Sequence, residues 1–192
     1  MRICSDDSIH TDSSVLALGM FDGVHLGHQA LLKQARALAD TLSVPMVVMT
    51  FDRHPLSLIA PKMAPPMLTS AQERLRLFEA QGADAVCVSP FTEELRSMAP
   101  EAFVKLLVDH WHPRIVVIGY NYNFGRHGAG TPDTMRALGK ELGFETVVVA
   151  EVRLNGHTVS STRIRQLLAE GDTAGAEALL GRSLRDENIN KA

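Results

Sequence analysis

The stretch SVLALGMFDGVHLGHQALL, residues 14–32, joins an apolar run to a helical pattern through a turn that holds glycines and two histidines. The run 14–21 is continuous rather than alternating, which is typical of a strand covered on both faces in a parallel sheet. After the turn, apolar residues recur close to one helical stripe from Ala30 to Leu38. The stretch therefore predicts a strand followed by a helix that opens near His25 and His28.

The same alternation of strand and helix continues along the chain. Further short, Val-rich runs predict strands at 44–51, 83–90, 114–120 and 145–152. Helical patterns between them carry end signals: Ser70 and Glu73 stand in capping-box spacing, and Thr131-Pro132 opens a segment that stops at Gly143. This order predicts an α/β, Rossmann-like doubly wound parallel sheet of about five strands with flanking helices.

Two regions do not follow this alternation of strands and helices. Residues 52–70 are rich in proline and have no period, so we expect a long surface loop, which after a strand is often functional. Asn155-Gly156 predicts the turn of a short hairpin, followed by two short helices over 160–181. We expect one α/β domain over 14–182, a flexible segment over 1–13 and a frayed tail over 183–192.

Composition narrows the function classes. The chain has 192 residues, 45% of them hydrophobic, and a net charge of −3, which argues against general binding to nucleic acid or to an anionic membrane. It has no apolar run of transmembrane length, and residues 1–14 do not show the hydrophobic core of a signal peptide. Cys4 and Cys87 are too few for a disulfide framework. These features predict a cytoplasmic globular protein.

The turn at residues 19–28 has the chemistry of a phosphate site. Ligands of open α/β sheets bind beyond the carboxyl ends of the strands, and Gly23 and Gly27 allow a tight turn and a close approach of backbone or ligand. The following helix offers free N–H groups, while His25 and His28 can both donate hydrogen bonds to phosphate oxygens. One alternative is a metal site, which would need further ligands, and no carboxylate or cysteine cluster supplies them. Another is that the two histidines are incidental residues of the helix surface, which is less expected for His-x-Gly-His at the end of the first strand.

Five segments carry a family resemblance. GMFDGVHLGH (19–28) resembles the signature of the nucleotidyltransferase superfamily, whose members hold a nucleoside triphosphate with His-x-Gly-His. The later segments are similar, in order and spacing, to the FMN adenylyltransferase (FAD synthetase) module of the prokaryotic bifunctional riboflavin kinase/FAD synthetase family. They are TFDRHP (50–55), IGYNYNFGRHGAGT (118–131), VSSTRIRQLLAEGD (159–172) and ALLGR (178–182).

The resemblance implies that FMN and ATP give FAD and pyrophosphate, with Mg²⁺ accompanying ATP. Such a reaction needs no protein nucleophile, only positioning and charge stabilisation, and the implied catalytic residues are His25 and His28. The implied ATP-binding residues are Gly19, Phe21, Asp22, Gly23, Gly27, Ser161, Thr162 and Arg163. The implied FMN-binding residues are Asp52, Asn121 and Phe124, and no residue is assigned as a metal ligand.

Several of these assignments have a simpler structural alternative. A Ser/Thr run before a helix is most often an N-cap, and the loop around Asn121 and Phe124 is also consistent with aromatic packing. Asp52 can meet FMN or Mg²⁺ or be solvated. Arg165, two residues beyond Arg163, is expected to point to another face of the helix and to be solvated.

The sequence leaves three functions in view. The first is FMN adenylyltransferase, and the second is an adenylyl- or cytidylyltransferase for another phosphorylated acceptor. The third is a non-catalytic protein that binds flavin or nucleotide. The family pattern continues into a riboflavin kinase domain, which the sequence is expected to lack, so a separate riboflavin kinase is a candidate partner.

Overall fold

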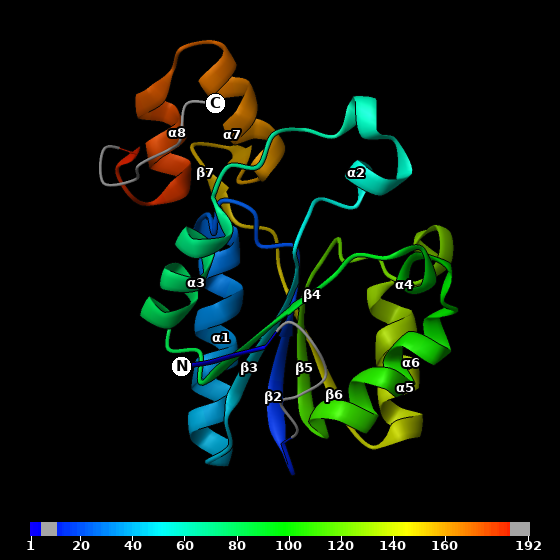
Figure 1. Ribbon diagram of the computed structural model, residues 1–192. Coiled ribbons are helices and arrows are strands. Elements are labelled where there is room, and N and C mark those ends of the chain that lie inside the picture. The colour runs from blue at the N-terminus through cyan, green and yellow to red at the C-terminus, as the bar shows by residue number, and fades with distance from the viewer. Residues whose placement is uncertain (5–10, 185–192) are drawn as a thin grey trace.

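The computed structural model describes residues 1–4 and 11–184, and its centre is a six-stranded sheet with helices on both faces (Figure 1). The strand order is β1-β4-β3-β2-β5-β6, and every neighbouring pair is parallel. The strands of this sheet are β1 Arg2–Cys4, β2 Ser14–Leu18, β3 Met46–Phe51, β4 Ala85–Ser89, β5 Pro113–Gly119 and β6 Glu145–Val149. The predicted Rossmann-like α/β fold is confirmed.

Helices cover both faces of the sheet and one of its ends. The α-helices are α1 Leu26–Leu42, α2 Leu56–Ile59, α3 Ala71–Ala80, α4 Glu93–Ser97, α5 Pro100–Trp111, α6 Pro132–Leu142, α7 Ser161–Ala169 and α8 Thr173–Leu180. Helices α1 and α3 lie on one face, α5 and α6 lie on the other, and α7 and α8 stand beyond the carboxyl ends of the strands (Figure 1).

The continuous apolar runs are explained by burial on both faces. In β2, Val15 and Ala17 pack toward α1 and α3, whereas Leu16 and Leu18 pack toward α5 and α6. All four side chains are almost completely buried, because a parallel sheet between two helical layers leaves neither face to solvent. A third apolar cluster joins α7 to α8 and begins at Val159.

The cap residues predicted from the sequence act as caps. Ser70 accepts a hydrogen bond from the Glu73 amide at the start of α3, and Thr131 accepts one from the Thr134 amide at the start of α6. The predicted hairpin is formed by β7 Arg153–Leu154 and β8 His157–Thr158. Its turn residues Asn155 and Gly156 both have positive φ, as their residue types favour.

Two features differ from the sequence prediction. A sixth strand, β1, pairs with β4 at the sheet edge and comes from the segment 1–13, where no strand was expected. The segment 52–70 is not irregular throughout, because it contains α2 and the 3₁₀ turn η1 Pro61–Met63. Pro55 and Pro61 stand at the starts of these turns, where their fixed φ suits a helix. The predicted tail 183–192 lies outside the described residues beyond Leu184.

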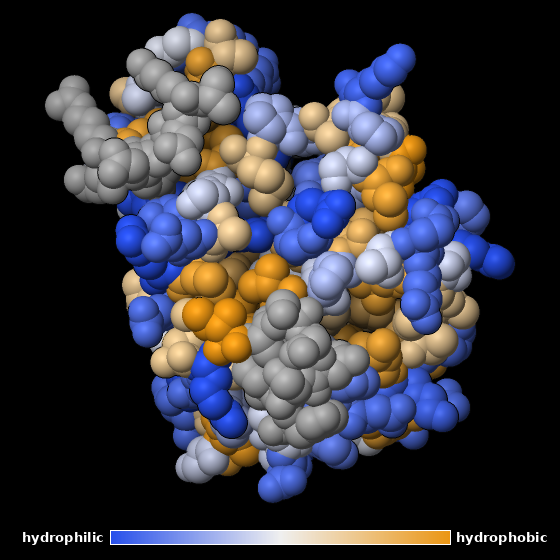
Figure 2. All heavy atoms as spheres, viewed as in Figure 1, coloured by the Kyte–Doolittle hydropathy of each residue, from blue (hydrophilic) through white to orange (hydrophobic). Residues whose placement is uncertain are grey.

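The segment that contains α2 crosses the molecule above the carboxyl ends of the strands (Figure 1). Leu58, Ile59 and Met63 are exposed in it, and apolar surface over α2 is visible at the upper right of Figure 2. Within the described residues, no helix is long and apolar enough to cross a membrane.

The topology marks one place where a ligand site is favoured. From β2 the sheet continues through β3 on one side and through β5 on the other, so the order reverses between β2 and β5. In open α/β sheets, the loops at the carboxyl ends of such strands diverge and leave a crevice. The loops that leave β2 and β5 are the two segments with the histidine turn and with Asn121.

Candidate active site

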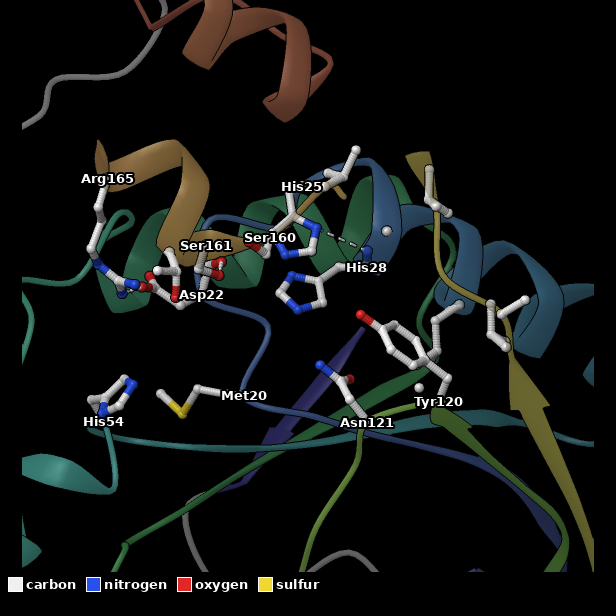
Figure 3. Close-up of a pocket in the computed structure, with 18 residues that line it drawn as sticks. Met20, Asp22, His25, His28, His54, Tyr120, Asn121, Ser160, Ser161 and Arg165 are labelled. Carbon is white, nitrogen blue, oxygen red and sulfur yellow. Dashed lines mark hydrogen bonds and ion pairs between the residues drawn. The ribbon is translucent and has the colours of Figure 1, made fainter. Parts of the chain in front are cut away.

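A cavity of about 280 Å³ lies at this crevice (Figure 3). Its walls come from the turn after β2, from the loop after β5 that carries Tyr120 and Asn121, from the end of β6, and from the start of α7. His54, from the segment after β3, closes one side. Segments far apart in the sequence therefore meet at the carboxyl edge of the sheet, as the motif positions predicted.

The two imidazoles of the turn form a stacked pair. The ring centroids of His25 and His28 are 3.7 Å apart, and the ring planes differ by 14°. Phe21 contacts His28 edge-on, with ring centroids 5.2 Å apart, and its own ring is buried against Phe78. Phe21 therefore supports the pair from behind and is not among the residues that line the cavity.

His25 is the N-cap of α1, a role that the sequence analysis did not assign to it. Its Nδ1 atom accepts a hydrogen bond of 3.3 Å from the His28 amide. The neutral ring therefore carries its proton on Nε2, which can donate to a ligand. Burial is the main cause that lowers the pKa of His25 to about 4, and the nearby Arg182 guanidinium lowers it further. The ring is neutral at physiological pH.

His28 is the less buried residue of the pair by surface exposure, and its ring is also neutral. Burial, followed by the neighbouring His25, lowers the pKa of His28 well below its usual value. Its Nδ1 atom is buried and has no hydrogen-bond partner within the described residues. Because a buried polar group without a partner costs free energy, this atom favours the presence of a ligand. The pair therefore offers hydrogen bonds from neutral rings and not a fixed double positive charge.

Each of the three glycines in the turn is favoured at its position by a different structural feature. Gly23 has a φ of +82°, which favours glycine, and its amide donates to the Thr69 hydroxyl. Gly27 lines the cavity, and a Cβ there would lie 3.2 Å from the His25 ring. At Gly19 a Cβ would lie 2.9 Å from the Phe21 ring. Of the three glycines, Gly27 lines the cavity, whereas Gly19 and Gly23 do not.

The hydroxyl-rich start of α7 meets the histidine turn directly. The Ser161 hydroxyl donates a hydrogen bond of 2.9 Å to the main-chain carbonyl of Asp22. Ser160 caps the helix by accepting from the Arg163 amide, and Thr162 is exposed beside the cavity. The first amides of a helix have no intrahelical partner, so the starts of α1 and α7 both present N–H groups here. Two helix N-termini at one cavity favour an anion.

Arg165 corrects the sequence-based expectation. It is not a solvated side chain: it lines the cavity, forms an ion pair with the buried carboxylate of Asp22 and donates to the Pro66 carbonyl. The physical reason is helical spacing. Residues four apart share a helix face, so Arg165 points where Ser161 points, whereas Arg163 is turned away and does not line the cavity.

Both oxygens of the Asp22 carboxylate are bound by protein donors. One oxygen accepts from the amides of Leu68 and Thr69, and the other is paired with Arg165. Asp22 is the one acidic residue among those that line the cavity. No group of three or more potential metal-ligating side chains exists within residues 1–4 and 11–184. These residues do not fit a protein-held Mg²⁺, and a Mg²⁺ that arrives with ATP would be held by phosphate oxygens and water.

A second cavity, of about 430 Å³, lies next to the first and is mainly aromatic. Its walls carry the rings of Phe51, Phe91, Phe103, Tyr122 and Phe124. Phe124 is held by two backbone hydrogen bonds with Gly130, where a side chain would strike its ring. Phe124 is thus both a packing residue and a lining residue of this cavity.

Asn121 and Asp52, the other two predicted FMN-binding residues, are placed differently. Asn121 lines the first cavity, opposite the imidazole pair (Figure 3). Asp52 lines neither of the two cavities. Its carboxylate accepts hydrogen bonds from the Phe91 amide and from Arg53. Burial raises the pKa of Asp52, but these hydrogen bonds outweigh burial and the pKa is lowered. Asp52 therefore holds two loops together.

Sequence reasoning missed the support beneath the site. Arg74 of α3 is buried, with 2% of its surface exposed, and donates to the carbonyls of Met20 and Phe51. It thereby ties together the segments that leave β2 and β3. In the sequence, Arg74 is one charged residue in a helical pattern, and nothing in its spacing distinguishes it from solvated neighbours.

Comparison with known proteins identifies the family. The family model described as FAD synthetase matches residues 7–163. The chain belongs to the FAD synthetase family. The cavity residues 20–31, His54 and 119–162 fall inside the matched range, whereas Arg165 falls just outside it.

Curated relatives of this FAD synthetase family member are longer than the chain itself. A bifunctional riboflavin kinase/FMN adenylyltransferase from Haemophilus influenzae is 34% identical over 171 residues, which are 88% of this chain and 56% of the relative. One of the same description from Listeria monocytogenes is 35% identical over 172 residues, 88% of this chain and 54% of the relative. The chain thus spans about half the length of these relatives.

A solved structure supports the same fold. A crystal structure described as a macrolide-efflux protein from Streptococcus pneumoniae aligns with a TM-score of 0.81 at 28% identity. The alignment covers 94% of this FAD synthetase family chain and 59% of the other chain. The similarity therefore extends over nearly the whole of this chain.

Proposed function

We propose that this chain is an FMN adenylyltransferase, which transfers the adenylyl group of ATP to the phosphate of FMN and releases pyrophosphate. One observation carries the proposal: the stacked imidazoles and the start of α7 converge on a single cavity. Ser161 joins the two segments through its hydrogen bond to the Asp22 carbonyl. A triphosphate needs several donors from different directions, and this convergence supplies them.

The first cavity suits the nucleotide. Val149, Ala150 and Val152, from the end of β6 and the residues after it, are apolar residues that line the cavity, and we call this part its apolar end. The imidazole pair and the amides at the starts of α1 and α7 form its polar end. We assign the base to the apolar end and the phosphates to the polar end, with Gly27, Ser161 and Thr162 against the phosphates.

The second cavity suits a flavin ring. An isoalloxazine is flat and largely apolar, and aromatic side chains bind such rings by stacking and edge contacts. The ring centroids of Phe51 and Phe91 are 5.3 Å apart in an edge-on arrangement, and those of the stacked Tyr122 and Phe124 are 5.9 Å apart. We assign the ring to this cavity, with Phe124 in its wall and Asn121 toward the phosphate. Asp52 contributes by holding the loop that bears Phe91.

In the proposed reaction, an oxygen of the FMN phosphate attacks the α-phosphorus of ATP. A new phosphorus–oxygen bond forms, the bond to the β-phosphate oxygen breaks, and pyrophosphate leaves with its electron pair. No side chain needs to form a covalent bond. The chain holds the two phosphates in line and stabilises the charge that grows on the leaving group, for which the Nε2–H group of His25 and the neutral imidazole of His28 are suited.

Product analysis tests the proposal. Purified protein with FMN, ATP and Mg²⁺ is expected to form FAD and pyrophosphate in equal amounts, measured by chromatography and a coupled pyrophosphate assay. Riboflavin in place of FMN is expected to give no FAD, because it lacks the attacking phosphate. Pyrophosphate release with another phosphorylated acceptor and not with FMN would assign a different acceptor. Binding of FMN and ATP without any pyrophosphate would indicate a binding protein.

A further inference from the structure

The segment ALLGR (178–182) is the one of the five family-like segments to which the proposed function gives no role. None of its residues lines either of the two cavities. It forms the end of α8, where Gly181 has a φ of +70° and caps the helix. A Cβ at Gly181 would lie 2.6 Å from the side chain of Leu26, so the end of α8 packs closely against the start of α1. The segment therefore adjoins the turn that carries the two imidazoles.

Arg182, which directly follows Gly181, contacts the backbone of the histidine turn. Its Nη1 atom donates a hydrogen bond of 2.7 Å to the main-chain carbonyl of Gly23 and a longer one of 3.4 Å to that of Val24. The Val24 carbonyl belongs to the peptide group that leads into His25. A contact that holds this peptide group therefore also determines the point from which the His25 side chain reaches the cavity.

The backbone of this turn needs such support, because it is not in a locally favoured conformation. Phe21 has a φ of +50° and Val24 has a φ of +38°. Positive φ is uncommon for residues other than glycine, and for a β-branched residue such as valine it is an outlier that persists only where the surrounding structure holds it. The side chain of Val24 is fully buried, and its carbonyl accepts the bond from Arg182. The contact with Arg182 is therefore one of those that hold the turn.

A second tie joins α8 to the turn and does not involve Arg182. The side-chain amide of Gln29, in α1, donates to the carbonyl of Val24 at 2.9 Å and to the carbonyl of Leu180 at 2.8 Å. Leu26 also packs against the apolar cluster that joins α7 to α8. The end of α8 is thus attached to the start of α1 through Gln29 and Leu26. Loss of the Arg182 guanidinium therefore removes a hold on the two carbonyls and leaves the helix docked.

We propose that Arg182 is a positioning residue, which holds the carbonyls of Gly23 and Val24 and thereby orients the imidazole of His25 toward the phosphates in the first cavity. The inference rests on the proposed function, because it takes His25 as a donor to those phosphates. Arg182 lines neither cavity, so it acts through the backbone and does not touch the substrates. The end of α8 thus takes part in the reaction without contributing a residue to the site.

Two substitutions at Arg182 weaken the contact to different degrees. Arg182→Met keeps the apolar part of the side chain and removes both hydrogen bonds and the charge. Arg182→Lys keeps the charge, but its side chain is one bond shorter and reaches the two carbonyls less well. The matched control is Arg136→Met, which removes an arginine of α6 that is paired with Asp133 at the surface and lines neither cavity.

The first measurement follows the ring of His25 without substrates. Proton–nitrogen NMR spectra distinguish a ring nitrogen that carries a proton from one that accepts a hydrogen bond, and His25→Asn assigns the signals. In the unmodified protein we expect Nε2 of His25 to carry the proton and Nδ1 to accept from the His28 amide. In Arg182→Met we expect a mixture of both tautomers, because the displaced ring loses this bond. Arg136→Met is expected to match the unmodified protein.

The second measurement separates turnover from binding. With FMN, ATP and Mg²⁺, we expect Arg182→Met to lower kcat by about 10- to 100-fold, since a small displacement of a catalytic group is costly. The KM for FMN is expected to change less than about twofold, because no flavin contact is lost. Arg182→Lys is expected to lie between Arg182→Met and the unmodified protein in kcat and in tautomer ratio. Arg136→Met is expected to leave kcat unchanged.

Unchanged kcat in Arg182→Met would overturn the inference. A lower kcat with an unchanged His25 spectrum would overturn it as well, because the loss would then not act through His25. If Arg182→Met does not fold, Arg182→Lys decides by the same two criteria. An unmodified protein that releases no pyrophosphate with FMN would overturn the proposed function and the role of Arg182 in the reaction, whereas the spectra would still show whether Arg182 holds His25.

Discussion

The Ser161 hydroxyl donates a hydrogen bond to the main-chain carbonyl of Asp22, across a separation of 139 positions in the sequence. The bond places the start of α7 over the turn that follows β2. It explains, together with the ion pair between Asp22 and Arg165, why two segments with unrelated spacing form one donor surface.

Replacing this hydroxyl is expected to loosen the contact between the two segments. Ser161→Ala is expected to lower the free energy of unfolding by about 1 kcal/mol, the typical net contribution of one hydrogen bond. Urea denaturation measures the change. The matched control is Thr162→Ala, whose side chain is exposed and for which we expect a change within about 0.5 kcal/mol. Equal effects of the two substitutions would contradict the role of the Asp22 contact.

Loss of His28 is expected to affect turnover more than binding. His28→Ala removes a donor that, in the proposed mechanism, acts where charge develops, so we expect turnover to fall by about 10² to 10³. Calorimetry with a non-hydrolysable ATP analogue is expected to show affinity within a few-fold of the unmodified protein. His157→Ala serves as the control. Unchanged turnover would remove His28 from the chemistry.

The ion pair between Asp22 and Arg165 is expected to be a strong structural contact. Asp22 is only 2% exposed, so Arg165→Met leaves a buried carboxylate without its cation. We expect a loss of about 3 kcal/mol in the free energy of unfolding, and a smaller loss when Asp22→Asn is added. Arg163→Met is the control and is expected to change stability by about 0.5 kcal/mol or less. A strictly additive double substitution would argue against the pair.

The neutral imidazoles predict a dependence of stability on pH. The folded-state pKa of His25 is about 4, whereas an unfolded histidine titrates near 6.5, so below pH 6.5 the unfolded state binds a proton that the folded state does not. Stability contributed by this group is fully present above about pH 6.5 and falls as the pH drops toward 4. The loss is about 2 kcal/mol by pH 5.

This dependence can be assigned to His25 with one substitution. Asparagine is also a favourable N-cap, so His25→Asn keeps the start of α1 and removes the titrating group. Free energies of unfolding measured at pH 7 and pH 5 are expected to differ less in His25→Asn than in the unmodified protein. Parallel losses in the two proteins would place the pH dependence elsewhere.

The sequence by itself determined the elements and their order. The continuous apolar runs, the caps at Ser70 and Thr131 and the turn at Asn155-Gly156 are local signals, because each depends on neighbours within a few residues. Parallel strands with helical crossovers then place the motif-bearing loops at one edge of the sheet. Fold class and the approximate location of the site follow from these signals alone.

Only the tertiary structure decided which side chains face the cavity. Arg165 faces the cavity and Arg163 does not. Ser161 is held against Asp22 by its hydrogen bond, and Arg165 lies on the same helix face because it follows Ser161 by four residues. Contacts between segments that are distant in sequence also decide three other features. These are the pairing of edge strand β1 with β4, the hydrogen bonds of the buried Arg74, and the position of His54 in the cavity wall. Burial likewise makes the two imidazoles neutral. Such contacts leave no periodic signal, since each joins residues whose spacing along the chain is arbitrary.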